Sequence, residues 1–401
     1  MKKLQIYNSL SGRKENFKAR KGRDVGIYVC GITPYDITHL GHAFTYAFFD
    51  VVVRYLRHLG YKVTYVQNLT DVDDDILKRA VQEHKNWRKL VQGNTQKYLE
   101  DMRWLNNLQP DVYPRASDHI PEMIHIIQKL LRGKAAYENN GNVYFSVDAK
   151  KDYGKLSKLP KAKMLPIANE RGNNPDDPNK RDALDFVLWQ AQKPGEPAWS
   201  SPWGLGRPGW HIECSAMSMK YLGETFDIHG GGRDLIFPHH ESSLAQSETA
   251  TGKQFVRYWV HPSMVLCDGE KMSKSLGNMV FISDLKKKYS PNTIRMYLLS
   301  HHYRSALDYN EKNIKPVQKT DELFKRAWRA QSGPGQSLDS SPHEQKFSEA
   351  MNNDLDIPLG LATLKNLANQ VLKNYREKNV TNARAFLTKA LHILGLMIEY
   401  E

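Results

Sequence analysis

A strand–helix–strand pattern near the N-terminus limits most strongly how this chain can fold. Residues 24–30 form a short apolar-rich run, and residues 62–68 form a second one. Between them, residues 41–59 form a long helical stretch that ends at Gly60, a residue type that often stops helices. A strand, a helix and a strand in this order predict a right-handed βαβ unit, and therefore an α/β fold with a parallel sheet. Ligands of such folds bind at the carboxyl ends of the strands, beside the N-terminus of the next helix.

The length and composition fit a globular protein of several domains. At 401 residues, with 40% hydrophobic and 25% charged residues, the chain is expected to form two or three domains. No apolar run is long enough to span a bilayer, and the start of the chain does not resemble a secretory signal. The three cysteines are widely spaced, which favours metal or catalytic use over a disulfide framework. We therefore expect a cytoplasmic protein without membrane association.

The charge balance leaves two interpretations open. The chain has 57 Lys and Arg against 44 Asp and Glu, a formal net charge of +13. This excess suits a polyanionic partner such as RNA. A generally lysine-rich surface, with ATP as the only polyanion handled, explains the charge equally well.

The middle and the end of the chain interrupt the α/β pattern. Residues 112–200 look like an insertion, with a helical pattern at residues 121–131 and a hairpin at residues 136–147 that turns at an Asn-Asn-Gly sequence. A second α/β segment spans about residues 209–260. Residues 331–342 are rich in Gly, Ser and Pro, and we expect them to separate a short helical tail from the rest.

Residues 38–42, Thr-His-Leu-Gly-His, lie at the predicted junction between the first strand and the helix. His39 and His42, beside the N–H groups of a helix N-terminus, form a cluster of donors suited to phosphate. Gly41 allows a flat base to approach the backbone closely. Taken alone the motif is weak, because histidine pairs at helix starts are often only caps or surface residues.

Residues 271–275, Lys-Met-Ser-Lys-Ser, follow Asp-Gly in a predicted loop. Lys271 and Lys274, three residues apart, could neutralise the charge that develops on a departing pyrophosphate. The plainer interpretation is a solvated basic turn. An HxGH motif followed much later by KMSKS, however, resembles the signature of the class I aminoacyl-tRNA synthetases. Small nucleotidylyltransferases share an HxGH-type site but do not normally carry the full KMSKS loop.

This resemblance implies a Rossmann-type parallel sheet with an inserted subdomain and a small C-terminal helical bundle. It implies catalytic roles for four residues: His39, His42, Lys271 and Lys274. Further segments are similar to the cysteinyl-tRNA synthetase family over about residues 1–310, namely residues 29–36, 68–74, 209–215, 226–232 and 237–241. The implied parts are two halves of a catalytic domain (1–111 and 201–260), the insertion (112–200), the KMSKS loop with a stem-contact region (261–315), and a helical bundle (316–401).

By the same resemblance, Cys30, Cys214 and His239 are zinc ligands, with the two cysteines at the ends of distant strands. Zinc held by thiolates and imidazole prefers a sulfur ligand, so it would select cysteine over serine through a bond that serine cannot make. The alternative is two buried free cysteines and a capped histidine.

The resemblance also implies a substrate pocket and a nucleotide site. The cysteine pocket would comprise Gly31, Thr33, Thr70, Trp210 and His229. The site for ATP and its Mg²⁺ would comprise Thr38, Gly41, Gly230, Gly231, Gly232, Asp234 and Lys274. Each has a plainer explanation, because tryptophan and threonine are common in cores and strands.

Two features depart from the synthetase pattern. Ser243 stands where the family has a glutamate that ligates zinc, so the site would keep an open position, or Glu241 or a water would complete it. After the predicted helices at residues 358–373 and 385–401, no anticodon-binding module is expected. The cysteine ligase of mycothiol biosynthesis, a paralogue, shares both departures.

We therefore expect a monomeric, ATP-dependent cysteine ligase that forms cysteinyl-adenylate, releases pyrophosphate and transfers cysteine to a small amine. The alternative is a cysteinyl-tRNA synthetase without an anticodon-binding domain, which would use tRNA(Cys) as the acceptor and would account for the basic charge. A catalytically silent RNA-binding paralogue is a third hypothesis, against which the intact HxGH and KMSKS motifs argue. The sequence assigns no role to Cys267.

Overall fold

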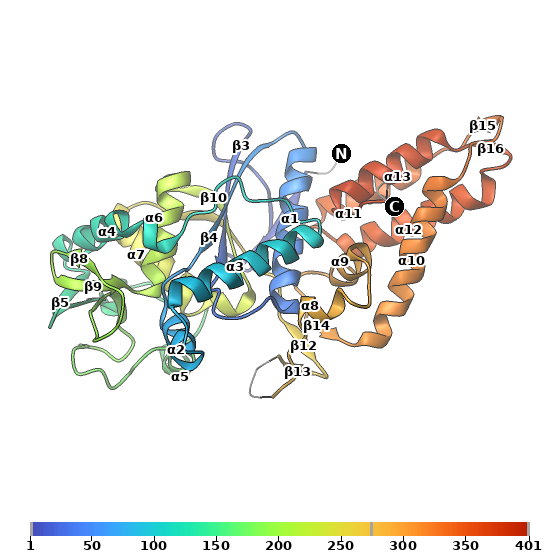
Figure 1. The fold of residues 1–401 in the computed structure, drawn as a ribbon. Helices are drawn as coiled ribbons and strands as arrows, with labels where there is room; N and C mark the ends of the chain where they lie inside the picture. Colours follow the sequence, from blue (N-terminus) through green and yellow to red (C-terminus); the bar gives the residue numbers. More distant parts are fainter. Residues whose placement is uncertain (1–2, 273–275, 399–401) are drawn as a thin grey trace.

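A four-stranded parallel sheet forms the centre of the protein (Figure 1). The computed structural model describes residues 3–272 and 276–398. The sheet has the order β11-β10-β3-β4, with the bounds Asp24–Ile32 for β3, Lys62–Leu69 for β4, Phe226–Gly230 for β10 and Val256–Val260 for β11. Helix α1 (Leu40–His58) joins β3 to β4. The predicted βαβ unit and the Rossmann-type sheet are confirmed.

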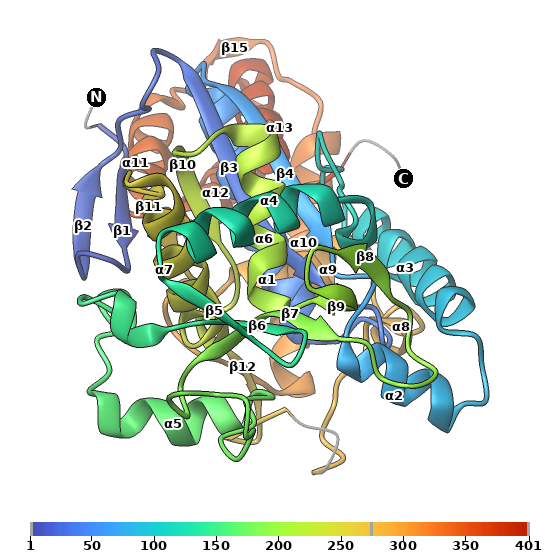
Figure 2. The same cartoon turned by 90° about the vertical axis from the view of Figure 1, so that its left-hand side faces the viewer.

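The two faces of this sheet pack into different hydrophobic cores. Because side chains alternate along a strand, Ile27 and Val29 of β3 pack on the side of α1, whereas Tyr28 and Cys30 pack on the opposite side. Helices α6 (Trp210–Leu222) and α7 (His239–Thr251) belong to that opposite side, and Figure 2 shows α6 lying in front of the sheet. Cys30 is therefore directed into the layer that contains Cys214.

The insertion is an antiparallel sheet preceded by a helix, α4 (Ile120–Arg132), that packs on α6 and α7. The sheet has the order β5-β6-β7-β9-β8, with the bounds Ala136–Asn139 for β5, Asn142–Phe145 for β6, Phe186–Ala191 for β7, Trp199–Ser201 for β8 and Gly204–Pro208 for β9. The predicted hairpin is β5–β6, and Asn140 and Gly141 turn it with φ of 52° and 75°. Helix α5 (Lys161–Asn169) lies in the long connection to β7.

Shorter elements flank the core. Helices α2 (Asp74–Gln82) and α3 (Trp87–Trp104) follow β4, and the hairpin of β1 (Gln5–Asn8) and β2 (Arg13–Asn16) packs beside β11. After β11, a small sheet has the order β13-β12-β14, with the bounds Val265–Cys267 for β12, Glu270–Lys271 for β13 and Leu307–Tyr309 for β14.

The C-terminal part is helical (Figure 1). Its helices are α8 (Ile282–Leu285), α9 (Pro291–Leu299), α10 (Ile314–Arg329), α11 (Ser341–Asn352), α12 (Ile357–Asn374) and α13 (Thr381–Ile393). The Gly/Ser/Pro-rich residues 331–342 connect α10 to α11 inside this bundle and contribute β15 (Gly335–Ser337), which pairs with β16 (Lys378–Asn379). They do not separate a tail, because α10 packs against α12 and α13. Within the described ranges, no helix combines the length and apolarity needed to cross a bilayer.

Candidate active site

A cavity of about 410 Å³ opens where β3, β4 and β10 end. This is the edge at which an α/β sheet binds its ligands. Most of the residues predicted from the sequence line it: Cys30, Gly31, Thr33, His39, Gly41, His42, Thr70, Trp210, Cys214, Gly232, Asp234, His239 and Lys271. Residues that lie more than 200 positions apart in the chain therefore line one cavity.

His39 has two functions in this arrangement. Its Nδ1 accepts hydrogen bonds from the backbone N–H of Gly41 at 3.1 Å and of His42 at 3.3 Å, so it caps the N-terminus of α1. Because Nδ1 accepts, the neutral ring must carry its proton on Nε2, which is then a donor for a ligand. The capping interpretation and the ligand interpretation are both compatible with the same ring.

His42 stacks on His39, with ring centroids 3.6 Å apart. Its Nδ1 has no hydrogen-bond partner within the described part of the chain. Burial, followed by repulsion from His39, holds the pKa of His42 well below its usual value of 6.5, so this ring stays neutral at ordinary pH. A buried imidazole nitrogen without a partner at the edge of a cavity is suited to a polar ligand.

Three soft donors gather on another wall of the cavity. The sulfur atoms of Cys30 and Cys214 lie 3.5 Å apart, and Nε2 of His239 lies 3.3 Å from the sulfur of Cys214. All three side chains are buried, and their donor atoms lie within 4.8 Å of one another. The sequence interpretation placed both cysteines at strand ends. Cys30 is near the end of β3, but Cys214 is in helix α6, so that part of the prediction is wrong.

The environment of the two cysteines favours a thiolate. Burial by itself raises the pKa of Cys214, but the contacts with Cys30 and His239 outweigh it and hold the pKa well below the usual value. The pair therefore carries its negative charge on Cys214. Metal ions bind the thiolate form of cysteine, so this set of donors fits a thiophilic metal such as zinc.

A chain of polar contacts lines the adjacent pocket wall. The backbone N–H of Gly31 donates to Oδ1 of Asn68 at 2.8 Å, and the hydroxyl of Thr70 donates to the carboxylate of Glu213 at 2.7 Å. Only glycine fits at position 31, because an added Cβ would lie 1.5 Å from the carbonyl oxygen of Asn68. Trp210 stacks on His239 with ring centroids 4.3 Å apart, so the indole packs directly against one of the three donors.

Four predicted residues do not line the cavity: Thr38, Gly230, Gly231 and His229. A Cβ at Gly230 would lie 2.1 Å from the ring of Phe49, so this glycine permits close packing of β10 against α1. His229 is completely buried and stacks on Trp259 at 4.6 Å. It lies beneath the cavity wall. Lys274 falls outside the described residues.

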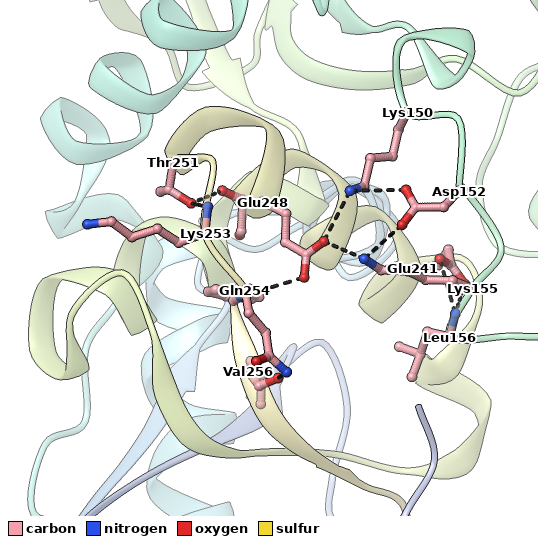
Figure 3. A network of polar contacts seen from close by, with 12 residues as sticks. Lys150, Asp152, Lys155, Leu156, Glu241, Glu248, Thr251, Lys253, Gln254 and Val256 are labelled. Atoms are coloured by element: carbon pink, nitrogen blue, oxygen red, sulfur yellow. Dashed lines mark hydrogen bonds and ion pairs between the residues drawn. The ribbon is translucent and has the colours of Figure 1, made fainter. Parts of the chain in front are cut away.

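The insertion holds helix α7 in place (Figure 3). The buried carboxylate of Glu241 accepts hydrogen bonds from the backbone N–H of Leu156 at 3.1 Å and of Ser157 at 2.7 Å. About two turns further along α7, Glu248 forms ion pairs with Lys150 and Lys155. Glu241 is thus bound to the insertion, and it does not complete the donor cluster.

Sequence reasoning missed the histidines that surround the donors. The Nδ1 atoms of His211 and His239 lie 3.0 Å apart, and Nε2 of His240 lies 3.1 Å from the sulfur of Cys30. His240 in turn contacts His261 at 2.8 Å. The pair of histidines at 239 and 240 was visible in the sequence, but nothing there distinguishes which of two adjacent residues faces a given sulfur.

Comparison with known proteins agrees with this geometry. A family model described as the catalytic domain of class I (C) tRNA synthetases matches residues 16–319. A protein from Cronobacter sakazakii named cysteine–tRNA ligase is 46% identical over 98% of this chain and 85% of its own length. One of the same name from Haemophilus influenzae is also 46% identical, over 98% of this chain and 86% of its own.

Solved structures support the fold. The Mycobacterium tuberculosis methionyl-tRNA synthetase in complex with methionyl-adenylate aligns with a TM-score of 0.70 over 94% of this chain and 92% of its own, at 14% identity. The relatives named above are tRNA ligases, so they do not support the predicted closeness to the mycothiol-pathway ligase. The family model and the two close relatives together show that this chain belongs to the cysteinyl-tRNA synthetase family of class I ligases.

Proposed function

We propose that this protein activates cysteine with ATP and transfers it to tRNA(Cys). The observation that carries the proposal is a single cavity lined both by the donors Cys30, Cys214 and His239 and by the His39–His42 pair. One wall suits a sulfur-containing substrate and the other suits a phosphate. An enzyme that joins the carboxylate of cysteine to the α-phosphate of ATP needs these two walls within one amino acid's length of each other.

The donor set fits zinc, which would be held by Cys30, Cys214 and His239. A zinc ion there would supply a bond to the thiol sulfur of the substrate, which serine cannot form. Trp210, which stacks on His239, lines the cavity together with Thr70 and Gly31, and all three would contact a bound amino acid. These residues would orient the carboxylate toward the nucleotide.

On the nucleotide side, an oxygen of the cysteine carboxylate attacks the α-phosphorus, and the bond from that phosphorus to pyrophosphate breaks. The carboxylate is already a nucleophile, so no strong general base is required. Nε2–H of His39 and the unpartnered nitrogen of His42 would donate to the charged phosphate oxygens as the transition state forms. Lys271, which lines the cavity mouth, would neutralise the departing pyrophosphate.

Two observations favour tRNA over a small amine as the acceptor. The close relatives are named cysteine–tRNA ligase and align with nearly the whole chain. A second hollow of about 640 Å³, lined by the basic residues Lys89 and Lys97 among others, shares Tyr35 with the cavity. A basic surface that adjoins the active site suits the phosphates of a nucleic acid.

The test measures activation and transfer separately. Cysteine-dependent exchange of pyrophosphate into ATP is expected, with little exchange for serine or alanine. Deacylated tRNA(Cys) should then yield an acid-precipitable cysteinyl ester, whereas glucosaminyl-inositol should leave cysteine unconsumed. Consumption with the amine alone would refute the tRNA assignment while retaining activation. A lack of exchange with every amino acid would refute the activation itself.

A further inference from the structure

One arginine of the insertion reaches the wall of the active-site cavity. Arg171 follows helix α5 in the long connection before β7, and its guanidinium donates a hydrogen bond to the carbonyl oxygen of Asp234. Nη1 of the same guanidinium lies 3.8 Å from Oδ2 of Asp234. Asp234 lines the cavity and belongs to the 3₁₀ turn Arg233–Ile236, which follows β10. A single side chain of the insertion therefore contacts both the backbone and the carboxylate of a residue in the cavity wall.

The two oxygens of the Asp234 carboxylate have different surroundings. Oδ2 is the oxygen nearer to Arg171, and no other ion pair or hydrogen bond to this carboxylate occurs within the described residues. Oδ1 lies beside Gly232, which also lines the cavity, and a Cβ added there would be 2.6 Å from this oxygen. A carboxylate can accept about four hydrogen bonds. Oδ1 therefore keeps its capacity to accept a hydrogen bond at the cavity wall.

A carboxylate in a nucleotide cavity restricts which part of the nucleotide can lie next to it. Its negative charge repels phosphates, whereas its oxygens accept hydrogen bonds from hydroxyl groups. His39, His42 and Lys271 line the same cavity and form its proposed phosphate side. The part of ATP that suits Asp234 is therefore the ribose, whose two hydroxyls are donors. Acidic side chains at the ends of parallel strands bind ribose hydroxyls in this way.

Arg171 is itself held in place by the insertion. Its backbone N–H donates to the carbonyl oxygen of Ala168 in α5 at 2.9 Å, and the backbone N–H of Asn173 donates to the same oxygen at 3.1 Å. Ala168 is buried in the same hydrophobic core as Phe237, the residue that follows the 3₁₀ turn. The arginine thus extends from a packed element, which allows it to fix the direction of Asp234.

We propose that Arg171 is a positioning residue for nucleotide binding, which orients the carboxylate of Asp234 toward the ribose hydroxyls of ATP. The inference rests on the proposed function and deepens it, because it gives the insertion a part in the activation of cysteine. The side chains of Arg171 and Asp234 are 23% and 40% exposed, so the pair should contribute little to the stability of the fold. An effect of Arg171 on ATP binding is therefore separable from an effect on folding.

The test replaces Arg171 and uses Arg181 as its matched control. Arg171→Met keeps a long side chain but removes the charge and the donors. Arg181 lies in the same connection, but its guanidinium packs over the ring of Tyr137 at 4.1 Å, within the insertion. Cysteine-dependent pyrophosphate exchange is measured over a range of ATP and cysteine concentrations, and again with 2′-deoxy-ATP and 3′-deoxy-ATP. Both analogues keep the reacting α-phosphate and lack one ribose hydroxyl, so they report on binding of the ribose.

The wild-type protein should use at least one deoxy analogue about 10-fold less well than ATP, the effect of one hydrogen bond to a charged group. Arg171→Met should raise KM for ATP about 10-fold, with kcat and KM for cysteine close to those of the wild type. It should also lose the discrimination against the deoxy analogue, whereas Arg181→Met should match the wild type. The proposal is wrong if Arg171→Met keeps KM for ATP within about twofold of the wild type or keeps its discrimination. Equal use of ATP and both analogues by the wild type would refute it as well.

A double variant tests whether Arg171 acts through Asp234. Asp234→Ala removes the carboxylate, so the addition of Arg171→Met should change KM for ATP by less than about twofold. A further increase of about 10-fold would show that Arg171 acts by another route, and the positioning role would be excluded. If Arg171→Met does not fold, Arg171→Ala is judged by the same criteria. An absence of cysteine-dependent exchange in the wild-type protein would refute the proposed function, and this inference with it.

Discussion

The double role of His39 gives a prediction in which stability and catalysis respond separately. Its Nδ1 accepts two backbone N–H groups at the start of α1, a cap whose loss costs about 1 kcal/mol of stability. Its Nε2–H is the proposed donor to phosphate, and loss of one such donor raises a barrier by about 2.7–4 kcal/mol, or 10²–10³ in rate. Asparagine is as good a cap as any residue, whereas alanine is a poor one.

His39→Asn should therefore keep the stability of the wild type and lose the activity. We expect its cysteine-dependent pyrophosphate exchange to fall by about 10²–10³, while its thermal midpoint stays close to that of the wild type. His39→Ala should lose the same activity and in addition about 1 kcal/mol of stability. If His39→Asn exchanges pyrophosphate within threefold of the wild type, His39 is only a cap, and the phosphate-binding role is wrong.

Three further changes probe other parts of the chain. Cys214→Ala should lose bound zinc, whereas the matched variant Cys267→Ala, at a site away from the donors, should keep it; equal zinc in both, by elemental analysis, would contradict the assignment. Burial holds the pKa of His42 in the folded protein below the pKa of the same residue in the unfolded chain. As the pH falls from 6.5 to 5.5, His42 is therefore protonated only in the unfolded chain. Protonation of His42 in the unfolded chain alone should lower the free energy of unfolding by at most about 1.4 kcal/mol over this pH range. Urea titration at both pH values should therefore show a smaller loss of stability for His42→Gln than for the wild type. Arg295→Met should destabilise the protein by about 3 kcal/mol in denaturation, because it removes one of the two arginines paired with the buried Asp50 (Arg54 remains) and leaves the buried carbonyls of Leu105 and Leu394 without their donor; a change below 1 kcal/mol would argue against these contacts.

The sequence predicted the parts of the fold whose signals are local. The βαβ unit and the β5–β6 hairpin follow from hydrophobic periodicity, from the length of each apolar segment and from turn residues, all within about 45 consecutive positions. The Gly/Ser/Pro-rich segment was misjudged as a boundary because composition reports flexibility, whereas the packing of α10 on α12 depends on contacts across it. Turn-forming composition occurs inside bundles as well as between domains.

The site was predictable only where a motif identifies it. The positions of Cys30 and Cys214 came from family resemblance, since 184 residues separate them and no spacing rule applies. His240 was not singled out because adjacent helical residues point about 100° apart, and packing alone decides which of them meets a sulfur. The preference for a small-amine acceptor rested on the tail and on Ser243, features that do not report what binds at the surface.

Helix α7 explains why an insertion far from the sheet affects the chemistry. The helix begins at His239, so His239 and His240 both lie in its first turn, where they face the sulfurs of Cys214 and Cys30 respectively. Glu241 in the same turn is buried, which raises the pKa of its carboxyl, and the backbone N–H groups of Leu156 and Ser157 donate to it and oppose that rise. The backbone of the insertion therefore replaces the water that this carboxylate loses. In doing so it fixes the first turn of α7, and with it the direction in which His239 and His240 face the two sulfurs.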